Sequence, residues 1–213
     1  HAPLESENHI KKYVASMFEL NGLLTEPYDP TTDRYTFHGY SEPTSLQMTL
    51  KKTTFQVDVI LCDHTVPTVS YCFSEIRTKL KDEYVGLSGQ EIRELKQKGC
   101  SIVHPVKTPV FAYVCDTTVN VLDQNPQLLT FPVIFIECTF LYPHEHDLAT
   151  SKKHVHWELL RPYVLANTRV LFVLIHFSLR YTEDEVLEFF RKERDLYSIH
   201  NIKIWAGDTS EAR

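Results

Sequence analysis

The sequence lacks the features that mark several common classes of protein. No apolar run approaches the roughly 18 residues that a membrane-spanning helix needs, and no secretory signal peptide is visible. Lysine and arginine (22) are outnumbered by aspartate and glutamate (28), so the formal net charge of −6 provides no general basic field for a polyanion. We therefore expect no membrane contact, and any contact with nucleic acid requires a local basic patch.

Cysteine pairs at metal-binding or redox spacings are absent as well. The five cysteines are odd in number and scattered: Cys62, Cys72, Cys100, Cys115 and Cys138. Three of them lie in apolar runs, where a free thiol behaves as a small hydrophobic residue. This pattern predicts a reducing intracellular compartment, with cytoplasm, nucleus and organelle all open.

The composition that remains is ordinary for a globular protein, with 43% hydrophobic and 23% charged residues in a chain of 213. Residues 1–213 contain no internal repeat, low-complexity segment or linker, so we expect them to belong to a single domain. The first residue is His1 rather than Met, which makes a processed or truncated chain one expectation.

Hydrophobic periodicity predicts three helices. They are expected at residues 7–20, 88–98 and 182–195, and each of the last two opens with a capping box. Gly22 and Gly99 are expected to end the first and second of these helices.

Strands are expected between and after these helices. Residues 35–76 contain two to four strands rich in β-branched and aromatic residues, and residues 202–206 form a last strand. The near-continuous apolar runs at residues 110–116, 133–138 and 169–177 predict strands that are buried on both faces. The order of elements therefore predicts an α/β fold.

Polar residues end or follow several of these strands. Asp116, Glu137 and His176 close the three apolar runs, and His64 follows an earlier strand. Each residue alone has an ordinary explanation, such as an aspartate that caps a turn or a histidine satisfied within a core. Strand ends in layered α/β proteins assemble sites from distant parts of the chain, and imidazole and carboxylate are ligands of divalent ions. Together these residues indicate a metal site.

Five short motifs then occur in a recognisable order. They are "DHTVPTVSYCF" around His64, "CDTT" around Asp116, "ECTF" around Glu137, "HVHW" from His154 and "HFSLRY" from His176. Over about residues 55–190 this order and spacing resemble the ribonuclease Z family, the metallo-β-lactamase-fold endonucleases that remove 3′ trailers from tRNA precursors. The resemblance implies an αββα sandwich, of which this sequence is a C-terminal portion that lacks the N-terminal part.

The resemblance also implies roles for individual residues. His64, Asp116 and His176 match metal ligands, with Asp116 bridging two zinc ions. Two such ions lower the pKa of a bridging water and hold the attacking and leaving oxygens of a phosphodiester. Glu137 and His154 match the pair beside the metals, with His154 placed to aid proton transfer to the leaving oxygen. The remaining matched residues would support the last ligand and the phosphate: Ser178, Arg180 and Tyr181.

One family motif, H-x-H-x-D-H, is absent from the sequence. Upstream of His64 only His1, His9 and His38 occur, at unrelated spacings. The chain is then a C-terminal fragment, a protein whose other half is a separate polypeptide, or a degenerate member without catalysis. In the first two cases another half completes the sandwich; in the third, this chain must bury its sheet alone.

A further departure is that residues 65–115 contain one helix but no Gly/Pro-rich basic arm for gripping RNA.

The stretch "HEHD" at residues 144–147 only mimics the absent motif. It has neither the spacer nor the final histidine, and it lies on the wrong side of Asp116. We expect His144, Glu145, His146 and Asp147 to form a solvated loop. The alternative is a local mononuclear metal site that would use His144, His146, His154 and His156.

The sequence thus predicts a zinc-dependent phosphodiesterase that resembles the tRNA 3′-trailer endonuclease and needs an H-x-H-x-D-H half. Two alternatives stay open: a non-catalytic scaffold or binding module, and a hydrolase of a smaller substrate on the same fold. The expected partners are a tRNA precursor, an N-terminal half and a second copy of the chain in a homodimer, with the helix at residues 7–20 as one candidate contact.

Overall fold

The frame of the molecule is a seven-stranded mixed sheet. The computed structural model describes residues 2–20 and 38–206, so the expectation for Gly22 lies outside the described residues. The strands, in their order across the sheet, are β3 (Thr44–Leu50), β4 (Thr53–Cys62), β5 (Thr68–Leu80), β6 (Val103–Val114), β7 (Val133–Glu137), β8 (Leu171–Ile175) and β9 (Ile202–Ile204). Neighbours from β3 to β6 are antiparallel and those from β6 to β9 are parallel. Two short strands, β1 (Ala2–Pro3) and β2 (Gly39–Tyr40), form a separate parallel pair.

The described residues form six α-helices, of which the first, second and last occupy the three predicted places. The six are α1 (Glu7–Leu20), α2 (Gly89–Gln97), α3 (Val121–Gln124), α4 (His146–Lys152), α5 (Trp157–Ala166) and α6 (Glu183–Tyr197). The predicted capping boxes form at Ser88 and Thr182, where the hydroxyl accepts the backbone N–H three residues on. Gly99 follows the C-cap residue Lys98 with a φ of +76°, a left-handed conformation that suits glycine at the end of a helix.

The core lies on one face of the parallel strands. Ala112 and Val114 of β6, Ile134 and Ile136 of β7 and Phe172 and Leu174 of β8 have no exposed surface. They pack against buried side chains from the covering helices, including Leu122, Leu160 and Phe190. Complete burial of each large apolar side chain contributes roughly 1.5–3 kcal/mol, so this layer is the main source of stability.

The opposite face of the same strands has no covering layer among the described residues, so the prediction of burial on both faces is wrong. A hollow of about 780 Å³ lies there, and its lining includes Phe111, Tyr113, Phe135, Ile175 and Trp205. Tyr113 is 40% exposed and Trp205 is 55% exposed. Apolar runs predict strands with two apolar faces, and here only one of those faces is packed.

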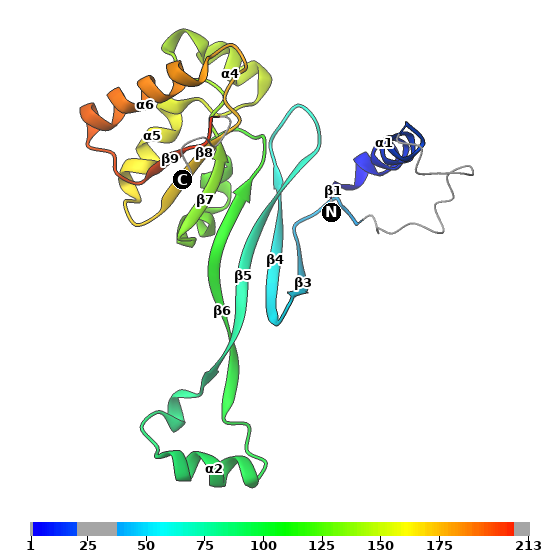
Figure 1. The fold of residues 1–213 in the computed structure, drawn as a ribbon, viewed down its shortest axis with the longest axis vertical. Coiled ribbons are helices and arrows are strands. Elements are labelled where there is room, and N and C mark those ends of the chain that lie inside the picture. Colours follow the sequence, from blue (N-terminus) through cyan, green and yellow to red (C-terminus); the bar gives the residue numbers. More distant parts are fainter. Residues whose placement is uncertain (1, 21–37, 207–213) are drawn as a thin grey trace.

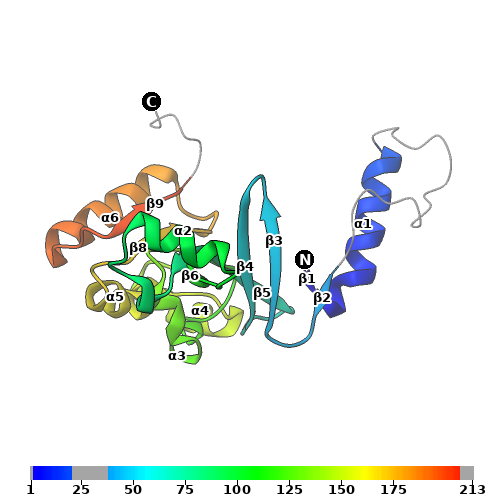
Figure 2. The same cartoon turned by 90° about the horizontal axis from the view of Figure 1, so that it is seen from below.

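The segment between His64 and Asp116 has a shape that the sequence did not predict. β5 and β6 run beyond the other strands as a twisted two-stranded arm with α2 at its far end (Figure 1). Helix α1 and the small β1–β2 sheet lie on the opposite side of β3 from α4, α5 and α6 (Figures 1 and 2). No helix in residues 2–20 or 38–206 is long and apolar enough to cross a bilayer.

Candidate metal centre

The predicted site residues meet at one edge of the sheet. Glu137 is the last residue of β7, while Asp116 and His176 follow the ends of β6 and β8. Because these strands are adjacent and parallel, their carboxyl ends reach the same edge. His64 arrives from the loop after β4, which lies at the same edge because the backbone N–H of Thr118 donates to the carbonyl of the neighbouring residue 63.

His154 lies between the other imidazoles. It follows the short helix α4, and the centroid of its ring is 4.7 Å from that of His64 and 5.3 Å from that of His176. The donor atoms of His64, Asp116 and His154 all lie within 4.8 Å of one another, and so do those of Glu137, His154 and His176. The structure therefore brings together the five residues predicted to be metal ligands or catalytic.

Glu137 is a fully buried carboxylate with a complete set of hydrogen bonds. Its Oε1 accepts the backbone N–H of Thr117 at 2.8 Å and Nδ1 of His154 at 2.8 Å. Its Oε2 accepts the hydroxyl of Thr139 at 2.7 Å and the backbone N–H of Val155 at 3.0 Å. Four donors offset the cost of burying a carboxylate and fix the orientation of this side chain.

The three imidazoles share one arrangement of hydrogen bonds. Nδ1 of His64 lies 3.0 Å from the carbonyl oxygen of Lys153, and Nδ1 of His176 lies 3.1 Å from the hydroxyl oxygen of Thr139. These contacts, like that of Nδ1 of His154 with Glu137, favour a proton on Nδ1, which leaves Nε2 of His64 and His176 available to a metal ion. Histidines that bind metals are held in this way by their second nitrogen. The donor set therefore fits divalent metal ions.

Electrostatics favour a proton on His154. The hydrogen bond that Glu137 accepts from His154 raises the pKa of this imidazole, and the charges of Glu137 and Asp116 act in the same direction against the opposing effect of burial. His154 can therefore hold a proton on Nε2 while Nδ1 stays bound to the carboxylate.

Comparison with known proteins identifies the family. No family model matches the chain. The tRNase Z TRZ1 of Arabidopsis thaliana is 36% identical over 128 residues, which cover 58% of this chain and 45% of that protein. The chloroplastic tRNase Z TRZ2 of the same plant is 30% identical over 149 residues, which cover 68% of this chain and 42% of that protein. The chain belongs to the ribonuclease Z family. It spans less than half the length of these two relatives.

Membership of the ribonuclease Z family and the mixed sheet with its flanking helices confirm the predicted α/β class of metallo-β-lactamase type. The solved structure of human tRNase Z, short form (ELAC1), aligns with a TM-score of 0.43 and 15% identity over 81% of this chain and 59% of that one. An alignment at this score carries no weight for function. An αββα sandwich completed by a second half stays a prediction.

The predicted supporting residues contact neighbours of the metal-centre residues. The backbone N–H of Ser178 donates to the carbonyl of Thr139 at 3.1 Å, which ties the loop after His176 to the loop after Glu137. Arg180 and Tyr181 do not approach the imidazoles. Both side chains donate to one carboxylate, that of Glu145.

The expectation of a solvated "HEHD" loop is wrong for the loop and for Glu145, while His144 and Asp147 are exposed as expected. Residues 143–145 form a 3₁₀ turn, α4 begins at His146, and Glu145 is only 4% exposed. A buried carboxylate needs hydrogen-bond donors, and residues 141–142 and 180–181 supply them. The pattern of polar residues in the sequence does not predict these donors. Neither the solvated-loop expectation nor the metal-site alternative for "HEHD" predicts a buried acid at Glu145.

The alternative mononuclear site of four histidines is not assembled. His154 belongs to the main centre, and His144 stacks on Tyr142. His146 and His156 do stack, with ring centroids 3.8 Å apart. However, Nε2 of His156 donates to the carbonyl of Tyr142 at 2.9 Å, and its Nδ1 accepts the backbone N–H of Glu158 at 3.2 Å. His156 therefore uses both nitrogens within the protein, although donor atoms of His146, His156 and Glu158 lie within 4.8 Å of one another.

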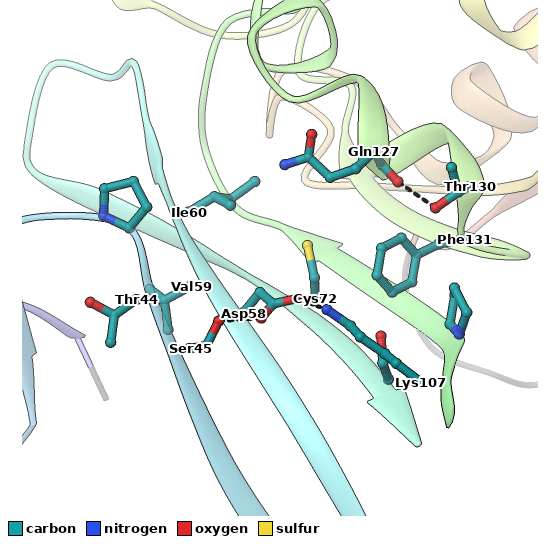
Figure 3. Close-up of a pocket in the computed structure, with 13 residues that line it drawn as sticks. Thr44, Ser45, Asp58, Val59, Ile60, Cys72, Lys107, Gln127, Thr130 and Phe131 are labelled. Atoms are coloured by element: carbon teal, nitrogen blue, oxygen red, sulfur yellow. Dashed lines mark hydrogen bonds and ion pairs between the residues drawn. The ribbon is translucent and has the colours of Figure 1, made fainter. Parts of the chain in front are cut away.

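A separate hollow of about 380 Å³ lies away from this centre (Figure 3). Its walls include the ion pair of Asp58 and Lys107 on one side and Phe131 on the other. Ser74 also lines it and has a buried hydroxyl without a hydrogen-bond partner among the described residues. None of the metal-centre residues lines this hollow, whereas His176 lines the larger hollow on the uncovered face of the sheet.

Proposed function

We propose that this chain supplies half of the active site of a zinc-dependent endoribonuclease that cuts the 3′ trailer from tRNA precursors. The observation that carries the proposal is the convergence of His64, Asp116, Glu137, His154 and His176 on one edge of the sheet. Relatives named tRNase Z support the substrate class. The proposal includes an H-x-H-x-D-H motif that comes from outside this sequence.

Three of these residues would hold two zinc ions. Asp116 would serve both ions, because a carboxylate offers two oxygens and its Oδ1, 3.6 Å from Nδ1 of His176, is not held by a hydrogen bond to that ring. His64 and His176 would each offer Nε2 to one ion. Bound zinc would lower the pKa of a water to near neutrality and stabilise charge on the scissile phosphate.

The Glu137–His154 pair would handle the departing group. When the P–O bond to the tRNA 3′-oxygen breaks, that oxygen needs a proton, and His154 can deliver one from Nε2. Glu137 keeps the ring in place through Nδ1 and stabilises its positive charge before the transfer. The neutral ring that remains is then reprotonated from solvent.

Two features outside the centre support the larger assembly. The uncovered apolar face of β6, β7 and β8 is suited to packing against a second sheet, which favours a missing half over a degenerate chain that buries its sheet alone. The arm of β5, β6 and α2 extends away from the body and carries basic side chains mixed with acidic ones, which offers a place for RNA backbone contacts. A homodimer is part of this proposal too.

The decisive experiment separates metal binding from cleavage. The chain is titrated with Co²⁺ as a spectroscopic substitute for zinc, and Asp116→Asn is compared with Asp123→Asn, which changes an aspartate that binds Tyr163 remote from the centre. We expect Asp116→Asn to weaken binding at least tenfold and Asp123→Asn to leave it unchanged.

Cleavage is then measured after a polypeptide with the H-x-H-x-D-H motif is added to the chain. Trimming of a tRNA precursor that is lost with His154→Ala supports the enzyme. No stoichiometric metal and no cleavage, even with the added polypeptide, would favour a binding module, as would an activity or interaction that survives Asp116→Ala.

A further inference from the structure

The carboxylate of Glu145 gathers donors from two distant segments. Its Oε2 accepts the backbone N–H groups of Leu141 at 3.2 Å and Tyr142 at 3.0 Å, and it also accepts the hydroxyl of Tyr181. Its Oε1 accepts Nη2 of Arg180 at 3.1 Å. The carboxylate thus connects the segment after Glu137 with the far end of the loop at residues 176–181.

That loop has two anchors. At its near end, the hydroxyl of Thr139 lies 3.0 Å from the carbonyl of His176, and the backbone N–H of Ser178 donates to the carbonyl of Thr139. At its far end, the side chains of Arg180 and Tyr181 both donate to Glu145, and the Tyr181 hydroxyl also accepts the backbone N–H of Leu141 at 3.2 Å. Without Glu145 the far end of the loop would lose two of these three hydrogen bonds, including its one charged contact.

The near end of the loop is conformationally demanding. His176 has a φ of +58°, in the left-handed region that residues other than glycine occupy at an energetic cost. Such a conformation persists when surrounding contacts determine it, and it decides where the imidazole points. A loop released at its far end can relax this angle, which would move Nε2 of His176.

Arg180 depends on the same contact. Its side chain is 56% exposed, and the guanidinium lies 5.5 Å above the ring of Phe140. Glu145 accepts one of its N–H groups and Ser178 accepts the Nε–H at 3.2 Å, which leaves the other donors directed to solvent. The carboxylate therefore fixes the plane in which the guanidinium presents its free N–H groups.

We propose that Glu145 is a positioning residue for the centre, which holds the loop at residues 176–181 so that His176 and Arg180 keep their orientation. The role of the centre in this proposal rests on the proposed function. The contact between Glu145 and the loop does not depend on that function. This positioning role differs from a purely structural role, in which Glu145 would only add to the stability of the whole fold.

The first test is amide hydrogen exchange on the metal-free chain. Glu145→Gln is compared with Asn201→Ala, a destabilising change remote from the centre, because the Asn201 amide donates to the carbonyls of Val164, Asn167 and Val170. We expect Glu145→Gln to speed exchange within residues 177–181 at least tenfold under conditions where the core stays protected. Asn201→Ala should leave those amides unchanged.

The second test is Co²⁺ affinity and its absorption spectrum. We expect Glu145→Gln to weaken binding about tenfold and alter the spectrum, with Tyr181→Phe intermediate and Asn201→Ala like the wild type. Exchange and affinity that change alike in Glu145→Gln and Asn201→Ala would overturn the proposal. Failure of the wild-type chain to bind Co²⁺ would count against the proposed function instead, and local exchange would then still decide whether Glu145 holds the loop.

Discussion

Nδ1 of His64 lies 3.0 Å from the carbonyl oxygen of Lys153. Lys153 is the C-cap of α4 and has a φ of +53°, so a left-handed turn directs this carbonyl toward the imidazole. The Lys153 ammonium also binds Asp63, at 2.7 Å. The end of one short helix thus orients a candidate ligand that lies 89 residues earlier in the chain.

Substitutions of Lys153 separate the turn from the ion pair. Lys153→Gly keeps the carbonyl, and glycine adopts the positive φ without strain, which should stabilise the fold by about 1 kcal/mol. This should offset the loss of an exposed ion pair worth about 0–1 kcal/mol. Lys153→Val places a β-branched residue in the same conformation and should cost about 1–2 kcal/mol. Urea unfolding measures both. Co²⁺ affinity should survive the glycine variant and fall about tenfold in the valine variant; equal affinities would mean that the turn does not orient His64.

The hydroxyl of Thr139 connects the buried Glu137 with the ring of His176. Thr139→Val keeps the shape and removes this link, so we expect Co²⁺ affinity to fall about 10–100-fold and the free energy of unfolding to fall by about 1–2 kcal/mol. Thr118→Val is the matched control, because the Thr118 hydroxyl is buried without a hydrogen-bond partner among the described residues. The control should be neutral or stabilising, and a similar loss of affinity in both variants would contradict the assignment.

Glu145 should make stability depend on pH in the acid range. Burial alone raises the pKa of this carboxyl, but the hydrogen bonds from Tyr181, Tyr142 and Leu141, together with the charge of Arg180, outweigh it and leave the pKa below its ordinary value of 4.5. The ionised form is therefore favoured by folding. Its contribution is complete above about pH 4.5 and disappears as the pH falls through the lower value of the folded state.

The variant Glu145→Gln cannot titrate, so it isolates this contribution. At pH 7 we expect it to be less stable than the wild type by roughly 2–4 kcal/mol, since one buried acceptor oxygen is replaced by an amide N–H₂. The difference should stay constant between pH 6 and 8 and shrink below about pH 4.5. Glu94→Gln on the exposed side of the arm should change stability by less than about 0.5 kcal/mol. A difference that grows with acid would reverse the assigned direction.

The sequence was informative where chemistry sits at strand ends. Asp116, Glu137 and His176 could be placed together because each closes an apolar run, and strand ends in layered α/β proteins assemble sites from distant parts of the chain. Thr139 stood inside the quoted motif "ECTF" and still received no role. Its role comes from a hydroxyl that contacts residues on three segments, and no periodicity encodes such contacts.

Glu145 shows a different limit. The sequence pattern predicts an exposed side chain for a glutamate between two histidines, because acids are rarely buried without partners. Its partners Arg180 and Tyr181 lie 35 and 36 residues later in the chain. The apolar runs have another limit. They predict two apolar faces on β6, β7 and β8, but they do not show whether any part of this chain covers the second face.

That second face gives the last prediction. Tyr113 and Trp205 are 40% and 55% exposed on it, so Tyr113→Ser with Trp205→Ser should change the free energy of unfolding by less than about 1 kcal/mol each. The double variant should reduce the fluorescence of a bound hydrophobic dye about twofold, whereas Leu196→Ser, at a 70% exposed position on α6, should not. If a second half packs on this face, the same double variant should weaken binding of the polypeptide with the H-x-H-x-D-H motif at least tenfold, because buried aromatic side chains dominate such interfaces. Unchanged binding would place that half on another surface.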